Sequence, residues 1–227
     1  MTNHSATILE IVNHIIIKHP SLVSAIEIMG LDGIGAEKKD QFKKWEERKF
    51  APPSPNFIKK ECLMRNGFPE STWIETGTYL GETTEFISMN SRQVYSIEPE
   101  PLLFENAKKK LENIKNIEII NGTSEEVMPL LLSKISGNVN FWLDGHYSAG
   151  VTFKGEKDTP ILDELNCIGE NLARFGKVCI MIDDVRCFNP MIDEYSSYPA
   201  LDVLVDWAKI HKLNWHIEHD IFVIKKY

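Results

Sequence analysis

Two apolar runs of the sequence each end in an aspartate, and a third aspartate follows the second run. Asp144 ends the run 139–144, Asp183 ends the run 178–183, and Asp184 comes next. Adjacent parallel strands lie about 4.8 Å apart, so carboxylates at the ends of neighbouring strands can converge on one point. Such groups repel one another unless they are protonated or bind a cation, and hard oxygen ligands favour Mg²⁺. We therefore expect a Mg²⁺ site here; the alternative for the aspartate pair is an Asx turn.

His146 stands two residues after Asp144, at the start of the polar loop 145–157. Histidine has an unperturbed pKa of about 6.5, which suits a general base at neutral pH. A structural hydrogen bond is an equally good explanation for a lone loop histidine. The loop itself could close over a substrate or be a surface insertion. Arg186, beside the aspartates, could pair with them or bind an anionic substrate.

A second group of residues follows the apolar run 72–76, where the sequence reads Glu75-Thr76-Gly77-Thr78-Tyr79-Leu80-Gly81. Gly77 allows a tight turn beside a ligand, and Gly81 allows close packing where a helix begins. The spacing is not the Gly-x-Gly-x-x-Gly of a dinucleotide site, and a carboxylate here would repel a pyrophosphate. A ligand with a positive group fits better, although two glycines can also serve only to form the turn between a strand and a helix.

Two further strand ends carry polar residues. Glu98 ends the run 93–98, and an acidic residue about 20 positions beyond a glycine turn typically accepts hydrogen bonds from ribose hydroxyls. A solvated glutamate is the alternative. Ser124 follows the run 117–121 and could cap a helix or approach a base ring.

The elements that would position these residues begin at residue 72, where apolar runs alternate with helical stretches. Near-continuous apolar strands separated by helices indicate a parallel sheet covered on both faces. The last two runs have only a tight turn between them, so they must pair antiparallel. We expect an α/β fold with a doubly wound, mostly parallel seven-stranded sheet and an antiparallel last strand. Strands are predicted at 72–76, 93–98, 117–121, 139–144, 178–183, 214–219 and 220–226, and helices at about 80–90, 100–113, 124–134, 158–174 and 199–211.

The segment before residue 70 is helical in pattern. Helices are predicted over 6–18, from Pro20 to Gly30, over 37–49 and from Pro55 to Gly67. The predicted domains are an N-terminal helical cap at 1–69 and a sheet domain at 70–227. The cap is too apolar for a lone appendage, so it must cover the sheet domain, cover a substrate pocket or pair with another copy. We expect a cap over the active-site edge that also contributes to a homodimer. Its apolar positions are Ile8, Ile11, Val12, Ile15, Ile16, Phe42 and Trp45.

Composition narrows the function classes. The 227 residues are 43% hydrophobic and 26% charged, with a formal net charge of −8. These proportions exclude a disordered chain or a fibre, and an acidic protein repels phosphate backbones, so we expect a small-molecule substrate and no nucleic acid. The four cysteines lack metal-ligand spacing, and Cys179 is expected in the core. No signal peptide or membrane span is recognisable, so we expect a cytoplasmic protein without a membrane partner.

These motifs together resemble the class I S-adenosylmethionine-dependent methyltransferases over about residues 70–227. The resemblance implies a Rossmann-like methyltransferase fold with Glu75 near the amino or sulfonium end of the cofactor and Gly77 beneath it. It also implies that Glu98 holds the ribose and that Ser124 lies near the adenine. The cofactor-binding residues that it implies are Glu75, Thr76, Gly77, Thr78, Tyr79, Gly81, Glu98, Thr123, Ser124 and Asp144.

The segments DGH and DD are also similar to the metal-dependent sugar O-methyltransferases related to macrocin O-methyltransferase. This resemblance implies that Asp144, Asp183 and Asp184 bind Mg²⁺, with Asp144 and His146 as catalytic residues. The chain departs from that group after Asp144, where the group usually has an acidic residue and an aromatic one and this chain reads Gly145-His146-Tyr147-Ser148-Ala149-Gly150. The expected reaction is Mg²⁺-dependent O-methylation of a sugar or natural-product hydroxyl.

Three other functions remain open at this point. A metal-independent small-molecule methyltransferase would use the aspartate pair only to order a loop. A non-catalytic partner subunit could keep the cofactor fold, and a nicotinamide-dependent oxidoreductase is disfavoured by the glycine spacing. The chain has no Asn/Asp-Pro-Pro-aromatic segment after the run 139–144, which disfavours methylation of base or amide nitrogens.

Overall fold

The computed structural model describes residues 35–145 and 159–227. It divides into two compact units, with the boundary between Pro55 and Asn56. The predicted helices at 6–18 and 20–30 lie outside the described residues, as do His146 and the whole of the predicted loop after it. No helix in the described part is long and apolar enough to cross a bilayer.

The first unit contains helix α3 (Ala36–Glu47), which covers most of the range predicted at 37–49. The rings of Phe42 and Trp45 meet edge to face at 6.0 Å, and Phe50 packs against Trp45 at 5.1 Å. The indole Nε1 of Trp45 donates to the carbonyl of Ala51 at 3.0 Å. Phe42 and Trp45, two of the predicted apolar positions, therefore pack together, and Trp45 holds the segment that follows α3.

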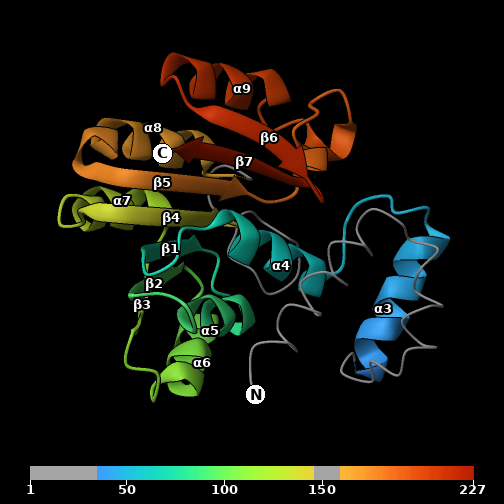
Figure 1. Ribbon diagram of the computed structural model, residues 1–227, viewed down its shortest axis with the longest axis horizontal. Helices are drawn as coiled ribbons and strands as arrows, with labels where there is room; N and C mark the ends of the chain where they lie inside the picture. Colours follow the sequence, from blue (N-terminus) through green and yellow to red (C-terminus); the bar gives the residue numbers. More distant parts are fainter. Residues whose placement is uncertain (1–34, 146–158) are drawn as a thin grey trace, which may run out of the picture. The chain divides into compact units, whose positions relative to one another are not determined.

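The second unit is a seven-stranded sheet in the order β3-β2-β1-β4-β5-β7-β6 (Figure 1). Strands β1 to β5 run parallel, and β7 runs antiparallel to both β5 and β6. The chain moves outward from β1 to β3 and then returns to β4 on the other side of β1, so the switch point lies between β1 and β4. This confirms the predicted doubly wound fold. The strands are β1 (Thr72–Thr76), β2 (Gln93–Glu98), β3 (Ile117–Asn121), β4 (Gly137–Leu143), β5 (Phe175–Ile182), β6 (Asn214–Glu218) and β7 (Ile221–Lys226).

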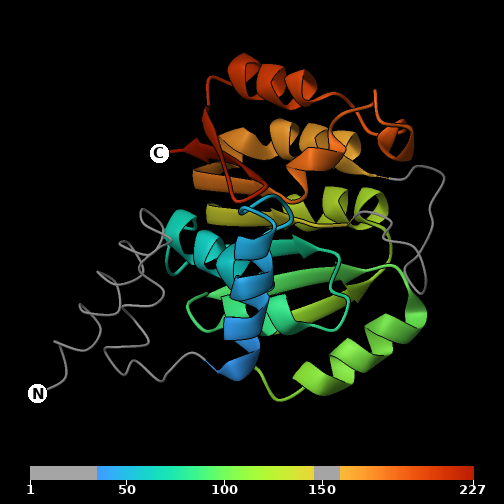
Figure 2. The same ribbon diagram turned by 90° about the vertical axis from the view of Figure 1, so that its right-hand side faces the viewer.

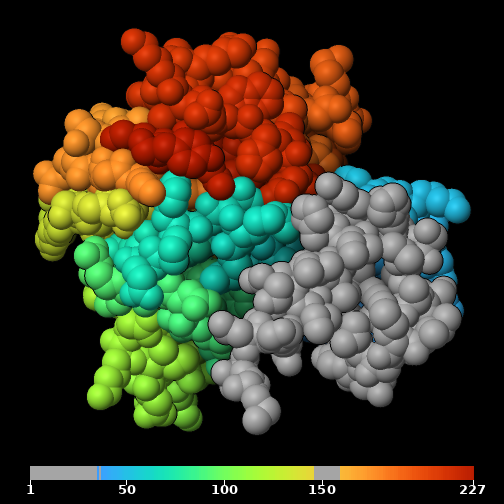
Figure 3. Space-filling model, viewed as in Figure 1, coloured from blue at the N-terminus to red at the C-terminus, as the bar shows by residue number. Residues whose placement is uncertain are grey.

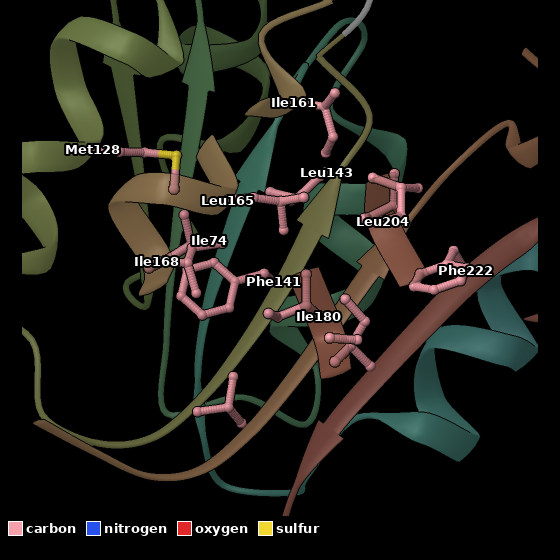
Figure 4. Close-up of a cluster of buried hydrophobic side chains, with 14 of the residues drawn as sticks. Ile74, Met128, Phe141, Leu143, Ile161, Leu165, Ile168, Ile180, Leu204 and Phe222 are labelled. Atoms are coloured by element: carbon pink, nitrogen blue, oxygen red, sulfur yellow. The ribbon is translucent and has the colours of Figure 1, made fainter. Parts of the chain in front are cut away.

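Helices cover both faces of this sheet (Figure 2). One hydrophobic cluster joins α7, α8 and α9 to strand residues such as Ile74, Phe141 and Ile180, as Figure 4 shows. The other cluster joins α4 and α5 to the alternate strand positions, including Trp73 and Cys179, which is buried as predicted. The helices are α4 (Asn56–Asn66), α5 (Glu82–Ser88), α6 (Pro101–Leu111), α7 (Ser124–Leu132), α8 (Ile161–Asn171) and α9 (Leu201–Ile210).

Strand alternation decides which helices the polar strand ends meet, because successive side chains point to opposite faces. Glu75 shares a face with Trp73 and therefore points toward α4 and α5, whereas Thr76 points toward α7 and α8. In β5, Asp183 continues the series of Cys179 and therefore faces α4. The space-filling view shows α4 lying against the C-terminal strands (Figure 3).

Candidate active site

The turn after β1 lies tightly against the end of β4 at the switch point. Gly77 has φ +88°, and a Cβ built on it would lie 2.5 Å from the carbonyl oxygen of Asp144. The backbone N–H of Asp144 in turn donates to Thr76 O at 3.1 Å. Only glycine fits this conformation and this spacing, so the predicted tight turn is present where the sheet changes direction.

Gly81 precedes α5 with φ +71°, and a Cβ there would come within 2.9 Å of Leu111. This is the close packing that the sequence predicts for the second glycine. Between the two glycines, Thr78 Oγ1 lies 2.6 Å from Ser96 Oγ in a buried contact. Tyr79 is half exposed, with a left-handed backbone at φ +49°. The turn therefore presents Tyr79 to solvent while Thr78 anchors it to β2.

Glu75 lies beneath this turn, in contact with α5 and β2. Its Oε2 accepts hydrogen bonds from Thr84 Oγ1 at 2.5 Å and from Ser96 Oγ at 2.6 Å. Burial raises the pKa of Glu75 to about 7, although these two hydroxyls oppose the shift. Its Oε1 has no hydrogen-bond partner among the described residues. Glu75 thus supports the turn from within the core, and its contact with a cofactor stays a prediction.

Glu98 is held at the end of β2 by two backbone donors. Its Oε2 accepts from Tyr79 N at 2.8 Å and its Oε1 from Glu100 N at 3.0 Å. Burial raises the pKa of Glu98, and those N–H groups oppose the rise. An ionised carboxylate oxygen can accept more than one hydrogen bond, so both oxygens can still receive a hydroxyl. The carboxylate is fixed between the first two strand ends, where the sequence predicts the ribose-binding acid.

A buried polar group that the sequence analysis missed lies on the opposite face. A Cβ on Gly145 would lie 3.0 Å from Thr76 Oγ1 and 3.6 Å from Glu164 Oε1, so both atoms border the end of β4. Both are buried and lack a hydrogen-bond partner within the described ranges. Burial raises the pKa of Glu164 to about 7, and the hydroxyl of Ser124 counteracts part of the shift. The sequence feature that could have identified Glu164 as buried is its position beside Leu165 in the apolar stripe of α8.

Replacing Glu164 by glutamine should reduce the pH dependence of stability. The pKa of Glu164 rises from 4.5 to about 7 on folding, so between these values the folded chain keeps a proton that the unfolded chain loses. The free energy of unfolding therefore falls as pH rises through this window, by up to about 1.4 kcal/mol per pH unit for this group. Glu164→Gln stays neutral and gains stability relative to the wild type across the window.

Urea denaturation at about pH 5 and about pH 8 measures this difference. The matched control is Glu170→Gln, which changes an exposed glutamate of the same helix. If Glu164→Gln and the wild type lose the same free energy between the two pH values, Glu164 is not protonated in the folded chain.

The three aspartates follow neighbouring strands, but a lysine of the chain meets two of them. Lys59 Nζ in α4 lies 2.5 Å from Asp183 Oδ2 and 3.0 Å from Asp184 Oδ1. Arg186 donates from Nη1 to Asp184 Oδ1 at 2.5 Å and from Nη2 to Asp184 Oδ2 at 3.0 Å. Of the two alternatives for Arg186, pairing with the carboxylates is the one observed.

This arrangement does not fit the predicted Mg²⁺ site. Among the described residues, no three His, Cys, Asp or Glu side chains are arranged to hold a metal ion. The oxygens of Asp183 and Asp184 that would coordinate Mg²⁺ accept hydrogen bonds from Lys59 and Arg186. The converging carboxylates are predictable from their strand-end positions, but their cation is not, because Lys59 is 124 positions before Asp183.

The predicted base His146 lies outside the described residues, so its distance to Asp144 is not defined. Thr123 precedes α7 as its N-cap residue, and Ser124 is the first residue of that helix. Ser124 is buried, and its hydroxyl lies 3.3 Å from Glu125 Oε2. The predicted capping role of Ser124 is therefore wrong, because Thr123 is the N-cap residue and, among the described residues, no side chain caps α7. An approach of Ser124 to a base ring stays a prediction.

The strand order and the reversed last strand define a Rossmann-like, doubly wound α/β protein with its polar cluster at the switch point. No family model and no curated protein matches the chain. Solved structures that resemble it include a Streptococcus mutans protein described as a methyltransferase in complex with SAH (18% identity, 77% of this chain, 98% of that chain, TM-score 0.46). The N-methyltransferase NodS from Bradyrhizobium japonicum with bound SAH is 12% identical, with 79% of this chain and 94% of that chain covered and a TM-score of 0.49.

An rRNA methylase from Streptococcus thermophilus is 16% identical, with 77% of this chain and 97% of that chain covered and a TM-score of 0.43. Identities and scores at this level concern the fold and transfer neither a substrate nor a site residue to this chain.

Proposed function

We propose that this protein is an S-adenosylmethionine-dependent methyltransferase that acts on a hydroxyl group of a small molecule. The observation that carries the proposal is the Glu98 carboxylate, fixed by Tyr79 N at 2.8 Å beside the glycine turn of β1. In doubly wound sheets, an acid at the end of the second strand accepts hydrogen bonds from ribose hydroxyls. The position of Glu98 therefore supports a nucleoside as the ligand.

The charges of the site favour a nucleoside with a positive group over a dinucleotide. Glu75 and Glu98 flank the glycine turn, and Asp144 follows the adjacent strand. These acids would repel a pyrophosphate, whereas they would attract a sulfonium or an amino group. Thr76 Oγ1, which is buried without a hydrogen-bond partner among the residues that the structure describes, could donate to a ligand at the same edge.

When bound, S-adenosylmethionine supplies an electrophilic methyl group. The chain then has to align the acceptor hydroxyl, exclude water and accept its proton. Asp144 at the end of β4 and His146 in the following loop are the proposed residues for the proton. Magnesium is not part of the proposal, because Asp183 and Asp184, two of the three carboxylates predicted to bind it, form ion pairs with Lys59 and Arg186.

The net charge of −8 supports a small-molecule acceptor over a nucleic acid, which such a surface repels. Calorimetric titration with S-adenosylhomocysteine and separately with NAD tests the cofactor assignment: the former is expected to bind and the latter is not. Transfer of a radiolabelled methyl group to a panel of hydroxyl compounds then identifies the acceptor class.

A further inference from the structure

Lys59 reaches the aspartate pair because α4 is fixed on the sheet by its own side chains. Cys62 and Leu63, three and four residues beyond Lys59, are fully buried in the cluster on that face. Residues at these spacings share a helix face, so burying them directs Lys59 toward the sheet. At the C-terminal end of α4, Arg65 forms an ion pair with Glu218 of β6 at 2.8 Å.

The ammonium group of Lys59 is enclosed by acids. The side chain of Lys59 is 15% exposed and that of Asp183 only 4%. Burial alone would lower the pKa of Lys59, but Asp183, Asp184 and Asp144 together outweigh it and hold the pKa above its ordinary value. All three aspartates predicted to bind a metal therefore act on one lysine.

The hydrogen bonds around the pair leave no carboxylate oxygen without a donor. Asp183 Oδ1 accepts from Asp184 N at 2.8 Å, and Asp183 Oδ2 accepts from Lys59. Asp184 Oδ1 accepts from Lys59 and from Arg186, and Asp184 Oδ2 accepts from Arg186. A divalent ion would have to displace two cationic side chains to reach these oxygens.

We propose that Lys59 is the resident cation of this acidic site: its ammonium group stands where a divalent ion would bind the strand-end carboxylates. The site therefore holds Asp183 and Asp184 in place without a metal ion, and it binds none while Lys59 is present. Lys59 is a positioning residue in this scheme. The inference concerns ion binding, so it stands independently of the proposed methyl transfer.

Removing the ammonium group should convert the cluster into a divalent-ion site. Mn²⁺ is the probe, and its binding to the full chain is followed by electron paramagnetic resonance. We expect no Mn²⁺ bound at this cluster in the wild type and one ion per chain in Lys59→Ala, at least about tenfold tighter than any binding to the wild type. Mn²⁺ or Mg²⁺ should then raise the melting temperature of the variant but not that of the wild type.

Three further variants make the result specific. Adding Asp183→Asn to Lys59→Ala should abolish the new ion site, and Lys59→Arg should bind no more Mn²⁺ than the wild type. Lys109→Ala, which changes an exposed lysine of α6, should also behave as the wild type. If Lys59→Ala does not fold, Lys59→Met keeps the length of the side chain without its charge and answers the same question.

Two results would overturn the inference. One is Mn²⁺ binding to the wild type that Asp183→Asn removes, because the ion would then displace Lys59. The other is a folded Lys59→Ala or Lys59→Met that binds no Mn²⁺. A failure of the proposed methyl transfer would appear instead as a lack of S-adenosylhomocysteine binding, with these ion measurements unchanged.

Discussion

Replacing Gly77 by alanine is expected to destabilise the protein by about 2–5 kcal/mol and to weaken binding of S-adenosylhomocysteine at least about tenfold. The left-handed backbone at φ +88° disfavours any side chain, and the new Cβ would lie 2.5 Å from Asp144 O and 3.0 Å from Asp144 C. These are backbone atoms, so no side-chain rotation relieves the contact. The turn after β1 and the end of β4 must separate, and both border the proposed cofactor site. Urea denaturation and calorimetric titration measure the two effects.

Gly137→Ala is the matched control for this prediction. Gly137 has nearly the same conformation, at φ +85°, but a Cβ built on it meets nothing within 4 Å. This variant should therefore lose only about 1–2 kcal/mol of stability, the cost of a side chain in the left-handed conformation, and keep its affinity for S-adenosylhomocysteine. Equal losses of stability and affinity in the two variants would show that the contact between Gly77 and Asp144 is unimportant.

Replacing Glu98 by glutamine should lower the affinity for S-adenosylhomocysteine by about 10–100-fold. Charge-assisted hydrogen bonds of the kind proposed to ribose contribute about 1.5–3 kcal/mol, and glutamine removes the charge while keeping the size of the side chain. It also leaves one of the backbone donors of Tyr79 or Glu100 without its acceptor. Melting temperature is therefore recorded for each sample, and titrations are made well below it.

Glu118→Gln, on the neighbouring strand β3, is the control because Glu118 is exposed. It should bind S-adenosylhomocysteine as the wild type does. Unchanged affinity in a folded Glu98→Gln would remove Glu98 from the proposed ribose site.

The fold follows from local sequence patterns. Apolar runs with β-branched residues alternate with helical stretches, and this local pattern alone requires parallel strands with crossover helices. The two glycines of the first turn are also recognisable in the sequence, because a tight turn and a close helix contact each require glycine at a fixed position after the strand. The period of two also predicts that Glu75 and Thr76 face opposite sides of the sheet, and the structure has Glu75 toward α5 and Thr76 toward α8.

The partners of the site residues could not be predicted in the same way. Lys59 belongs to a helix that the sequence analysis assigned to a separate cap, and no local pattern relates it to Asp183. Its role depends on how α4 packs on the sheet, which is set by Cys62 and Leu63 and by distant strands. Glu164 did leave a signal, since an acid in an apolar helix stripe is unusual. Its neighbours Thr76 and Gly145, however, are known only from the fold.

The most direct measurement of the central claim is calorimetric titration of the intact wild-type chain with S-adenosylhomocysteine, with NAD as the parallel ligand. The carboxylates around the glycine turn and the ribose-binding position of Glu98 predict one bound S-adenosylhomocysteine per chain and no binding of NAD. Binding of NAD without S-adenosylhomocysteine, or of neither ligand, would contradict the assignment of this site to a methyltransferase.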